Sequence, residues 1–345
     1  MRTLACRVQC PGAMVSARPL RYVTDRSPGL VRRRAGDGFD YLRPDGSRVD
    51  DAASLQRIQR LAVPPAWEHV WIALDARAHI QATGRDARGR KQYRYHALWQ
   101  AHRSQAKFER LAETGRALSK LRRAVAADLR RPGLPRERVL ALVVSLIDRS
   151  GARVGNAEYR RSNGSFGLST LRDRHLRVRG SRLTLAFRGK SGVMQRLEVD
   201  DRRLAKLARR CQELPGQTLF QYVDAGGKPR PVTSQLVNAY LRRRMGFGAS
   251  TKDLRTWQGS ASALRHLCSG ASKTSVQEAV AKVALELGNT KAVCRRFYIH
   301  PRILELHASG DLQGLWEAAP RRSGLSREEC ALLALVEAGP RALAA

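Results

Sequence analysis

The sequence is poor in acidic residues and has no long apolar run. Of its 345 residues, 30 are Asp or Glu and 64 are Lys or Arg, so the formal net charge is +34. Such an excess opposes compaction through self-repulsion and therefore predicts a polyanionic partner. Nucleic acid is the first candidate for this partner, and an anionic membrane surface is the second. No apolar segment is long enough to span a bilayer, and residues 1–14 lack the apolar core of a signal peptide.

Paired cysteines and the common metal-binding motifs are absent as well. The six cysteines are scattered without a C-x-x-C pair, which favours reduced thiols in a cytoplasm. The histidines form no H-E-x-x-H pattern, and the acidic residues form no D-x-D pair to hold Mg²⁺. Gly189-Lys190-Ser191 is not a nucleotide-binding phosphate loop, because the glycine that this motif needs five residues earlier is Thr184.

What is present is a globular composition with a large share of arginine. Hydrophobic residues make up 43% of the chain, which is enough for packed cores and excludes an intrinsically disordered protein. Arginine supplies most of the positive charge, and its planar guanidinium can bind two phosphate oxygens at once. A GC-rich genome is a second explanation for part of the arginine excess, but it does not explain the shortage of acids.

Patterning predicts an α+β fold in four segments. Residues 1–15 are typical of a disordered tail, with Met14 as the candidate start of the protein. Residues 16–100 form a small strand-rich domain, and residues 101–318 form a larger, mainly helical domain with a small β-sheet. Residues 319–345 are expected to be a helix and tail without an assigned role.

Local hydrophobic periodicity supports this division. The continuous apolar run Val70–Leu74 indicates a buried strand in the first domain. The apolar stretch Val139–Asp148 predicts a helix at the core of the second domain. Leu183, Leu185 and Phe187 alternate with less apolar residues, which predicts a half-buried strand leading to the turn at Gly189.

Strand signals on both sides of residues 86–90 predict a hairpin in the first domain. On its second strand, Lys91, Tyr93 and Tyr95 share one face because side chains alternate along a strand. Tyrosines on such a face can stack or donate hydrogen bonds to phosphates. Ordinary core packing is an equally good explanation of this pattern.

Five short sequence segments, called phrases below, contain residues that suit phosphate chemistry. Each phrase alone is typical of a surface charge cluster. The phrases are Gly84–His96, Leu146–Asn156, Phe187–Lys190, Lys252–Trp257 and Leu287–Pro301. Together and in this order they resemble the type IB DNA topoisomerases, specifically the bacterial and poxvirus-like branch. The resemblance covers roughly residues 20–310.

The resemblance implies a catalytic domain of the type IB topoisomerase and tyrosine recombinase type, with the strand-rich domain as a DNA clamp. It implies an ATP-independent DNA topoisomerase that relaxes supercoiled duplex DNA by single-strand cleavage, strand rotation and religation. Tyr298 is the implied nucleophile, which forms a 3′-phosphotyrosyl intermediate and releases a 5′-hydroxyl. The phosphotyrosine conserves the energy of the broken bond, so no cofactor and no metal is expected.

The residue types fit the roles that the resemblance implies. Arg153 and Arg255 are the implied pair of fixed donors for the non-bridging oxygens, because guanidinium groups stay charged. Lys190 is the implied general acid for the departing 5′-oxygen. Tyr298 is a modest nucleophile by nature, and the adjacent Arg295 and Arg296 are expected to favour its ionised form.

Asn289 occupies a position where many relatives carry histidine, whereas bacterial members resemble this chain in carrying asparagine. An amide can donate a hydrogen bond to a phosphoryl oxygen, but it cannot act as an acid. We therefore expect Asn289 to supply transition-state hydrogen bonding alone.

The implied partner is double-stranded DNA, bound by a monomer in the cytoplasm in association with the nucleoid, with no membrane contact. The candidate DNA contacts are Lys91, Gln92, Tyr93, Tyr95, Tyr159, Arg174 and His175.

Two rival functions are a tyrosine recombinase or integrase and a non-catalytic basic DNA-binding protein. Recombinases usually have a His-x-x-Arg motif, but here no such motif precedes Arg255-Thr256-Trp257. The intact set of Arg153, Lys190, Arg255 and Tyr298 opposes a decayed site.

Overall fold

The computed structural model describes residues 19–269 and 274–338. The chain divides into two compact units, Met1–Ala106 and Lys107–Ala345, and the division falls inside the long helix α2 (Ala97–Asp128). The predicted tail at residues 1–15, with the candidate start at Met14, lies outside the described residues.

The first unit is built on a five-stranded antiparallel sheet with the strand order β2-β1-β3-β4-β5. Its elements are β1 (Gly29–Ala35), β2 (Gly38–Leu42), α1 (Ala52–Arg60), β3 (Glu68–Ala73), β4 (Ile80–Arg85) and β5 (Lys91–Tyr95). The predicted hairpin around residues 86–90 is confirmed as β4 and β5.

The central strand β3 is buried on both faces, which explains its continuous apolar run. Val70 and Ile72 pack with Ile58 of α1 on one side, whereas Trp71 and Ala73 belong to a second cluster on the other. The prediction was wrong at its last residue, Leu74, which is exposed beyond the end of the strand.

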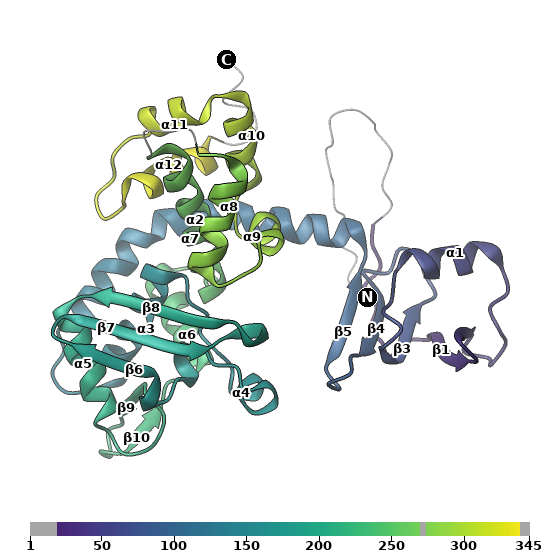
Figure 1. The fold of residues 1–345 in the computed structure, drawn as a ribbon, viewed down its shortest axis with the longest axis horizontal. Coiled ribbons are helices and arrows are strands. Elements are labelled where there is room, and N and C mark those ends of the chain that lie inside the picture. Colours follow the sequence, from purple (N-terminus) through teal and green to yellow (C-terminus); the bar gives the residue numbers. More distant parts are fainter. Residues whose placement is uncertain (1–18, 270–273, 339–345) are drawn as a thin grey trace. The chain divides into compact units, whose positions relative to one another are not determined.

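The second unit has one large hydrophobic core. Figure 1 shows the helices and strands that surround it. Besides its part of α2, its helices are α3 (Arg136–Ser150), α4 (Ala157–Asn163), α5 (Arg202–Gln212), α6 (Ser234–Met245), α7 (Thr251–Cys268), α8 (Val276–Leu287), α9 (Lys291–Phe297), α10 (Pro301–Ser309), α11 (Leu312–Ala318) and α12 (Arg327–Glu337). Its strands are β6 (Leu176–Arg179), β7 (Arg182–Arg188), β8 (Met194–Asp200), β9 (Gln221–Val223) and β10 (Pro229–Pro231). Single 3₁₀ turns lie at Leu168–Thr170, Asp173–His175 and Lys190–Gly192.

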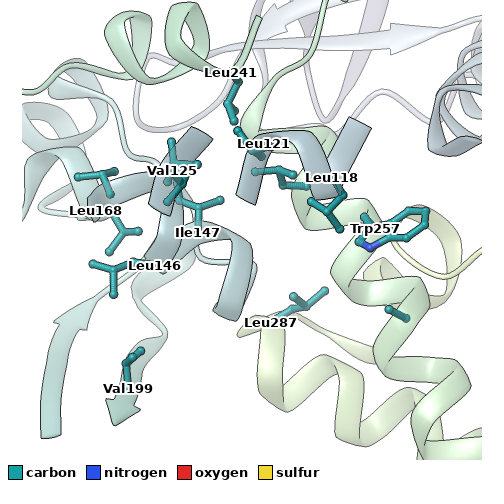
Figure 2. Close-up of a cluster of buried hydrophobic side chains, with 14 of the residues drawn as sticks. Leu118, Leu121, Val125, Leu146, Ile147, Leu168, Val199, Leu241, Trp257 and Leu287 are labelled. Atoms are coloured by element: carbon teal, nitrogen blue, oxygen red, sulfur yellow. The ribbon is translucent and has the colours of Figure 1, made fainter. Parts of the chain in front are cut away.

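Helix α3 lies at the centre of this core, as its apolar sequence predicts. Every residue from Val139 to Asp148 is buried. Figure 2 shows Ile147 of α3 in one cluster with Leu118 and Leu121 of α2, Trp257 of α7 and Leu287 of α8. Burying each such large side chain contributes about 1.5–3 kcal/mol. The core therefore fixes the helices whose ends carry the candidate site.

The strands β6, β7 and β8 form an antiparallel sheet in that order. The predicted alternation is confirmed, since Leu183, Leu185 and Phe187 are buried and Arg188 is exposed. Helix α5 contacts β6 and β7, and the hairpin of β7 and β8 turns at Lys190–Gly192.

The C-terminal helix α12 is part of the second unit's core. Leu332, Leu333 and Leu335 are buried, and α12 packs against α7. Residues 339–345 lie outside the described residues. Within the described chain, no helix is long and apolar enough to cross a membrane.

Candidate active site

Four of the five predicted catalytic residues come together in the second unit. Arg255 lies inside α7, whereas the other three follow helix C-termini. Arg153 follows Gly151, the C-cap of α3, and Asn289 follows the C-cap of α8. Tyr298 is itself the C-cap of α9. Cations are stabilised near helix C-termini, so this arrangement suits a site rich in arginine.

Arg255 joins two of these helix ends. Its Nη1 donates to the carbonyl of Gly151, and its Nη2 donates to the carbonyl of Leu287, the last residue of α8. These are carbonyls that a helix cannot satisfy internally. The side chain is only 4% exposed, and its Nε has no hydrogen-bond partner among the described residues. Arg255 thus holds the segments of Arg153 and Asn289 together and keeps one buried donor unused.

Arg153 and Asn289 contact each other directly. Arg153 Nη2 donates a hydrogen bond of 2.7 Å to Oδ1 of Asn289. Nδ2 of Asn289 is buried and, within the described part of the chain, has no nitrogen or oxygen partner. The site therefore contains a second unused donor beside the guanidinium of Arg153.

Tyr298 lies against Arg255, whose Cζ is 5.0 Å from the centre of the tyrosine ring. The tyrosine backbone is fixed by α7, because Ser260 Oγ donates to the carbonyl of Tyr298 over 2.9 Å. The same Oγ accepts from the backbone N–H of His300 at 3.0 Å. Gly259 permits this approach, since a Cβ there would lie 2.8 Å from the Tyr298 carbonyl oxygen.

The charges of the site follow from burial. Burial, together with the charge of Arg153, lowers the pKa of Arg255 to about 10, and contact with Tyr298 opposes this shift. Arg255 therefore stays charged at neutral pH. Burial raises the pKa of the neighbouring Cys294, whose thiol lies beside Asn289 and stays protonated. Among the described residues, no three His, Cys, Asp or Glu side chains are placed to hold a metal ion.

Lys190 lies at the tip of the β7–β8 hairpin and is exposed. Its neighbour Ser191 has a φ of 62°, and Gly192 has a φ of 80°, so the turn places two successive residues in the left-handed region. The start of β8, just after this turn, touches the Asn289 segment, because a Cβ on Gly288 would lie 2.0 Å from Oε1 of Gln195. Lys190 is thus connected to the other four residues through Gln195.

The candidate DNA contacts of the first unit lie together on β5. The rings of Tyr93 and Tyr95 stack with centres 5.8 Å apart, and Lys91 Nζ lies 5.7 Å from the Tyr93 ring centre. Lys91 is paired with Asp25. Gln92 donates to Asp86 over 2.9 Å, which ties it to the preceding turn. Since Tyr93 is 42% exposed, this face is open and is not a packed core.

Arg174 and His175 lie in the 3₁₀ turn before β6. Arg174 is exposed, whereas the His175 ring packs edge-on against Phe166, with centres 4.6 Å apart. His175 Nδ1 accepts from the backbone N–H of Arg172. Partial burial, with Arg174 and Arg172 nearby, lowers the pKa of His175. The prediction for Tyr159 falls on a side chain outside those that the structure describes.

Sequence reasoning missed the residues that support this site. Arg295 and Arg296 were expected beside Tyr298, but both are exposed on α9, and Arg296 Cζ instead lies 5.2 Å from the Phe297 ring centre. Among the side chains that the structure describes, Arg255 and Lys107 are the cations placed against the Tyr298 ring. Ser260, Gly259 and Gln195 gave no motif signal, because their roles depend on contacts between distant segments.

Comparisons with known families agree with this geometry. Residues 96–308 match the family model described as eukaryotic DNA topoisomerase I, catalytic core. Residues 38–86 match the model described as bacterial DNA topoisomerase IB, N-terminal domain. All five predicted catalytic residues fall within the first of these two matches.

Curated relatives point the same way. DNA topoisomerase 1B of Acanthamoeba polyphaga mimivirus is 31% identical over 293 residues, covering 81% of this chain and 87% of its own. DNA topoisomerase 1B of Vaccinia virus (strain Copenhagen) is 20% identical over 274 residues, covering 74% of this chain and 83% of its own. A comparison of structures, which carries no weight for function at this level, matches the XerH site-specific recombinase bound to palindromic difH substrate with a TM-score of 0.37 at 15% identity, covering 56% of this chain and 50% of its own.

Proposed function

The chain belongs to the type IB DNA topoisomerases, and on that premise we propose that Tyr298, Arg153, Lys190, Arg255 and Asn289 carry out its DNA transesterification. The Tyr298 oxygen attacks the scissile phosphorus and loses its proton. An O–P bond to Tyr298 forms, the bond from phosphorus to the 5′-oxygen breaks, and that oxygen takes a proton. Religation is the same exchange in reverse, after the free 5′ strand has rotated.

One observation supports this assignment most strongly: in the described part of the chain, two buried donors in the cluster around the nucleophile have no nitrogen or oxygen partner. They are Nε of Arg255 and Nδ2 of Asn289. Buried donors are normally hydrogen-bonded, so an unused pair indicates that a ligand completes them. A non-bridging phosphate oxygen has the charge and acceptor capacity to do so. Arg153, which contacts Asn289, adds the second guanidinium of the proposed clamp.

The proposed role of Lys190 is to protonate the departing 5′-oxygen. Its exposed position on a hairpin tip lets a bound DNA strand reach it. The contact between Gln195 and Gly288 supports this role, because it holds the turn end of the hairpin beside the Asn289 segment. General-acid catalysis of this kind contributes about 10²–10⁴-fold in rate.

Strand β5 is the proposed DNA contact of the first unit, through Lys91, Tyr93 and Tyr95 on one face and through Gln92, the intervening residue. On DNA, Lys91 would exchange its partner Asp25 for a phosphate. Arg174, His175 and Tyr159 are proposed as further contacts in the second unit. Phosphate contacts of this kind make affinity fall steeply with salt. One copy of the chain holds every proposed catalytic group, so we expect a monomer to be active.

A covalent trapping experiment tests the assignment of the nucleophile. The substrate is a duplex in which the strand 3′ to the cleavage site is short enough to dissociate, so that the adduct accumulates. We expect wild type to attach to the strand labelled at its 5′ end, and peptide mapping to locate the adduct at Tyr298. Attachment to the other strand, or a full adduct yield from Tyr298→Phe, would contradict the proposal.

A further inference from the structure

Lys107 of α2 is a second cation at the ring of the proposed nucleophile. Its Nζ lies 5.4 Å from the centre of the Tyr298 ring and 4.5 Å from the centre of the Phe108 ring. Arg255 contacts the same tyrosine ring with its Cζ at 5.0 Å. Lys107 belongs to none of the sequence phrases that predicted the site. It reaches Tyr298, the C-cap of α9, from a distant part of the sequence.

The ammonium group of Lys107 has no anionic partner in the part of the chain that the structure describes. Asp253 of α7 is the acidic group whose charge raises the pKa of Lys107. Its carboxylate already accepts hydrogen bonds from the backbone N–H and Oγ of Ser250. Arg110, on the same helix as Lys107, forms a 3.7 Å ion pair with Asp253. An unpaired ammonium that is largely removed from water is costly, unless an anion arrives or the proton leaves.

Two further titratable side chains near Lys107 offer it no negative charge. Lys252 of α7 repels it, and His300, before α10, is uncharged because burial lowers the pKa of its ring to about 4. Burial first, and the charge of Lys252 second, lower the pKa of Lys107 to about 7, against the opposing effect of Asp253. Free protein near neutral pH therefore holds Lys107 partly without its proton.

We propose that Lys107 is a further active-site residue, whose charge beside the Tyr298 ring stabilises the negative charge that this side chain develops as it attacks. This inference rests on the proposed role of Tyr298. The scissile phosphate supplies the anion that Lys107 lacks among the described residues, and its arrival favours the protonated form. DNA binding is thereby coupled to proton uptake beside the nucleophile. The group acts through its charge and does not accept the phenol proton.

Two substitutions separate charge from proton transfer. Lys107→Met keeps much of the side-chain length and removes the charge, whereas Lys107→Arg keeps a permanent charge that cannot accept a proton. Lys120→Met is the matched control, since Lys120 is an exposed lysine on the same helix. Wild type and Tyr298→Phe complete the set. Every variant is measured with the same adduct-trapping substrate at a saturating DNA concentration. A variant that binds DNA weakly is then not mistaken for one whose chemical step is slow.

The measurement is the single-turnover rate of covalent adduct formation between pH 6 and 9.5. We expect Lys107→Met to be about 10- to 100-fold slower than wild type, because one charge at this distance is lost from a poorly solvated site. We expect Lys107→Arg to stay within about threefold of wild type, with Lys120→Met unchanged. Wild type should lose rate at the alkaline end, where Lys107 gives up its proton, and the arginine variant should lose less.

The outcomes separate this inference from the proposed function. A wild-type rate for Lys107→Met would overturn it, and so would an arginine variant as slow as the methionine variant. The alkaline difference between wild type and Lys107→Arg provides a readout that a purely structural role would not move. If wild type itself forms no Tyr298 adduct, the proposed function fails, and the role of Lys107 that rests on it fails with it, whereas a wild-type adduct with an unaffected Lys107→Met variant overturns the role of Lys107 alone.

Discussion

Arg153 Nη2 and Asn289 Oδ1 are joined by a hydrogen bond of 2.7 Å between residues 136 positions apart in sequence. A guanidinium has only donors, so the amide must turn its oxygen toward Arg153. The amide nitrogen of Asn289 is thereby presented as a donor, and it is buried without an oxygen or nitrogen partner among the described residues. The pair therefore fixes which end of the amide would meet the phosphate in the proposed reaction.

Substitutions of Asn289 should follow from this orientation. Asn289→His keeps a donor and should retain substantial cleavage, whereas Asn289→Ala should lose about 10²–10³ in rate. Asn289→Asp keeps the acceptor for Arg153 but replaces the donor with a negative charge, so it should be at least as slow as the alanine variant. Single-turnover cleavage measures the series, and equal rates for the histidine and alanine variants would refute the role.

The contact of Gln195 with Gly288 predicts a selective defect in proton donation. Gln195→Ala should release the Lys190 hairpin from the Asn289 segment and slow cleavage of ordinary DNA by about 10-fold or more. A substrate with sulfur in place of the scissile 5′-oxygen should be cleaved at nearly the wild-type rate, because a thiolate leaves without a proton.

Lys190→Ala should cleave ordinary DNA more slowly than Gln195→Ala does, and its rate should likewise be restored on the sulfur-substituted substrate. Gln313→Ala is the matched control, since Gln313 lies exposed on α11. If Gln195→Ala is equally slow on both substrates, its contact does not serve the general acid.

Acid should remove a stabilising contribution of His300. Its pKa is lowered from 6.5 to about 4, chiefly by burial and then by Arg302 and Lys107. The unfolded chain therefore binds a proton between these values while the folded chain does not. The contribution is complete above pH 6.5 and is lost as the pH falls toward 4, by about 1–3 kcal/mol.

His300→Asn is the variant that isolates this effect. His300 is the N-cap of α10 and accepts from the backbone N–H of Arg302, and asparagine is a good N-cap without a titrating group. Urea unfolding of both proteins from pH 4 to 7 measures the difference. We expect the stability advantage of wild type to shrink with falling pH, and a constant difference would contradict the assignment.

The buried network around Arg122 should stabilise the frame of the site. Arg122 binds Asp148 of α3 and Glu329 of α12, each at 2.8 Å, and Glu329 also accepts from Trp257 of α7 at 3.1 Å. Glu329→Ala should lower the free energy of unfolding by about 3–5 kcal/mol, because it leaves a partly buried guanidinium with one partner fewer. Urea unfolding checks this value against Glu317→Ala, an exposed control on α11, which should change it little.

Much of the fold could be predicted from the sequence, because its periodic segments are long and their local preferences agree with the final structure. The apolar helix around Ile147 and the alternating strand around Leu185 needed no tertiary information. The end of β3 could not be placed in the same way, because Leu74 is as apolar as its neighbours and only the neighbouring strands decide where pairing stops.

The candidate site was predictable where residues lie in compact phrases and not where they act across distance. Arg153, Arg255, Asn289 and Tyr298 each stand in such a phrase, and the structure brings the four together. Lys107 is one lysine in a basic helix, and nothing in its local sequence signals that it reaches Tyr298. Sequence proximity favoured Arg295 and Arg296 instead, yet the short helix α9 leaves both of them exposed.

The most direct measurement is relaxation of negatively supercoiled plasmid in EDTA without ATP, with wild type and Tyr298→Phe side by side. The account predicts complete relaxation by wild type and none by the variant, since only the phenol oxygen can hold the broken strand. Relaxation by both proteins would place the nucleophile elsewhere. Failure of both, while each still binds the plasmid, would contradict catalysis by this site.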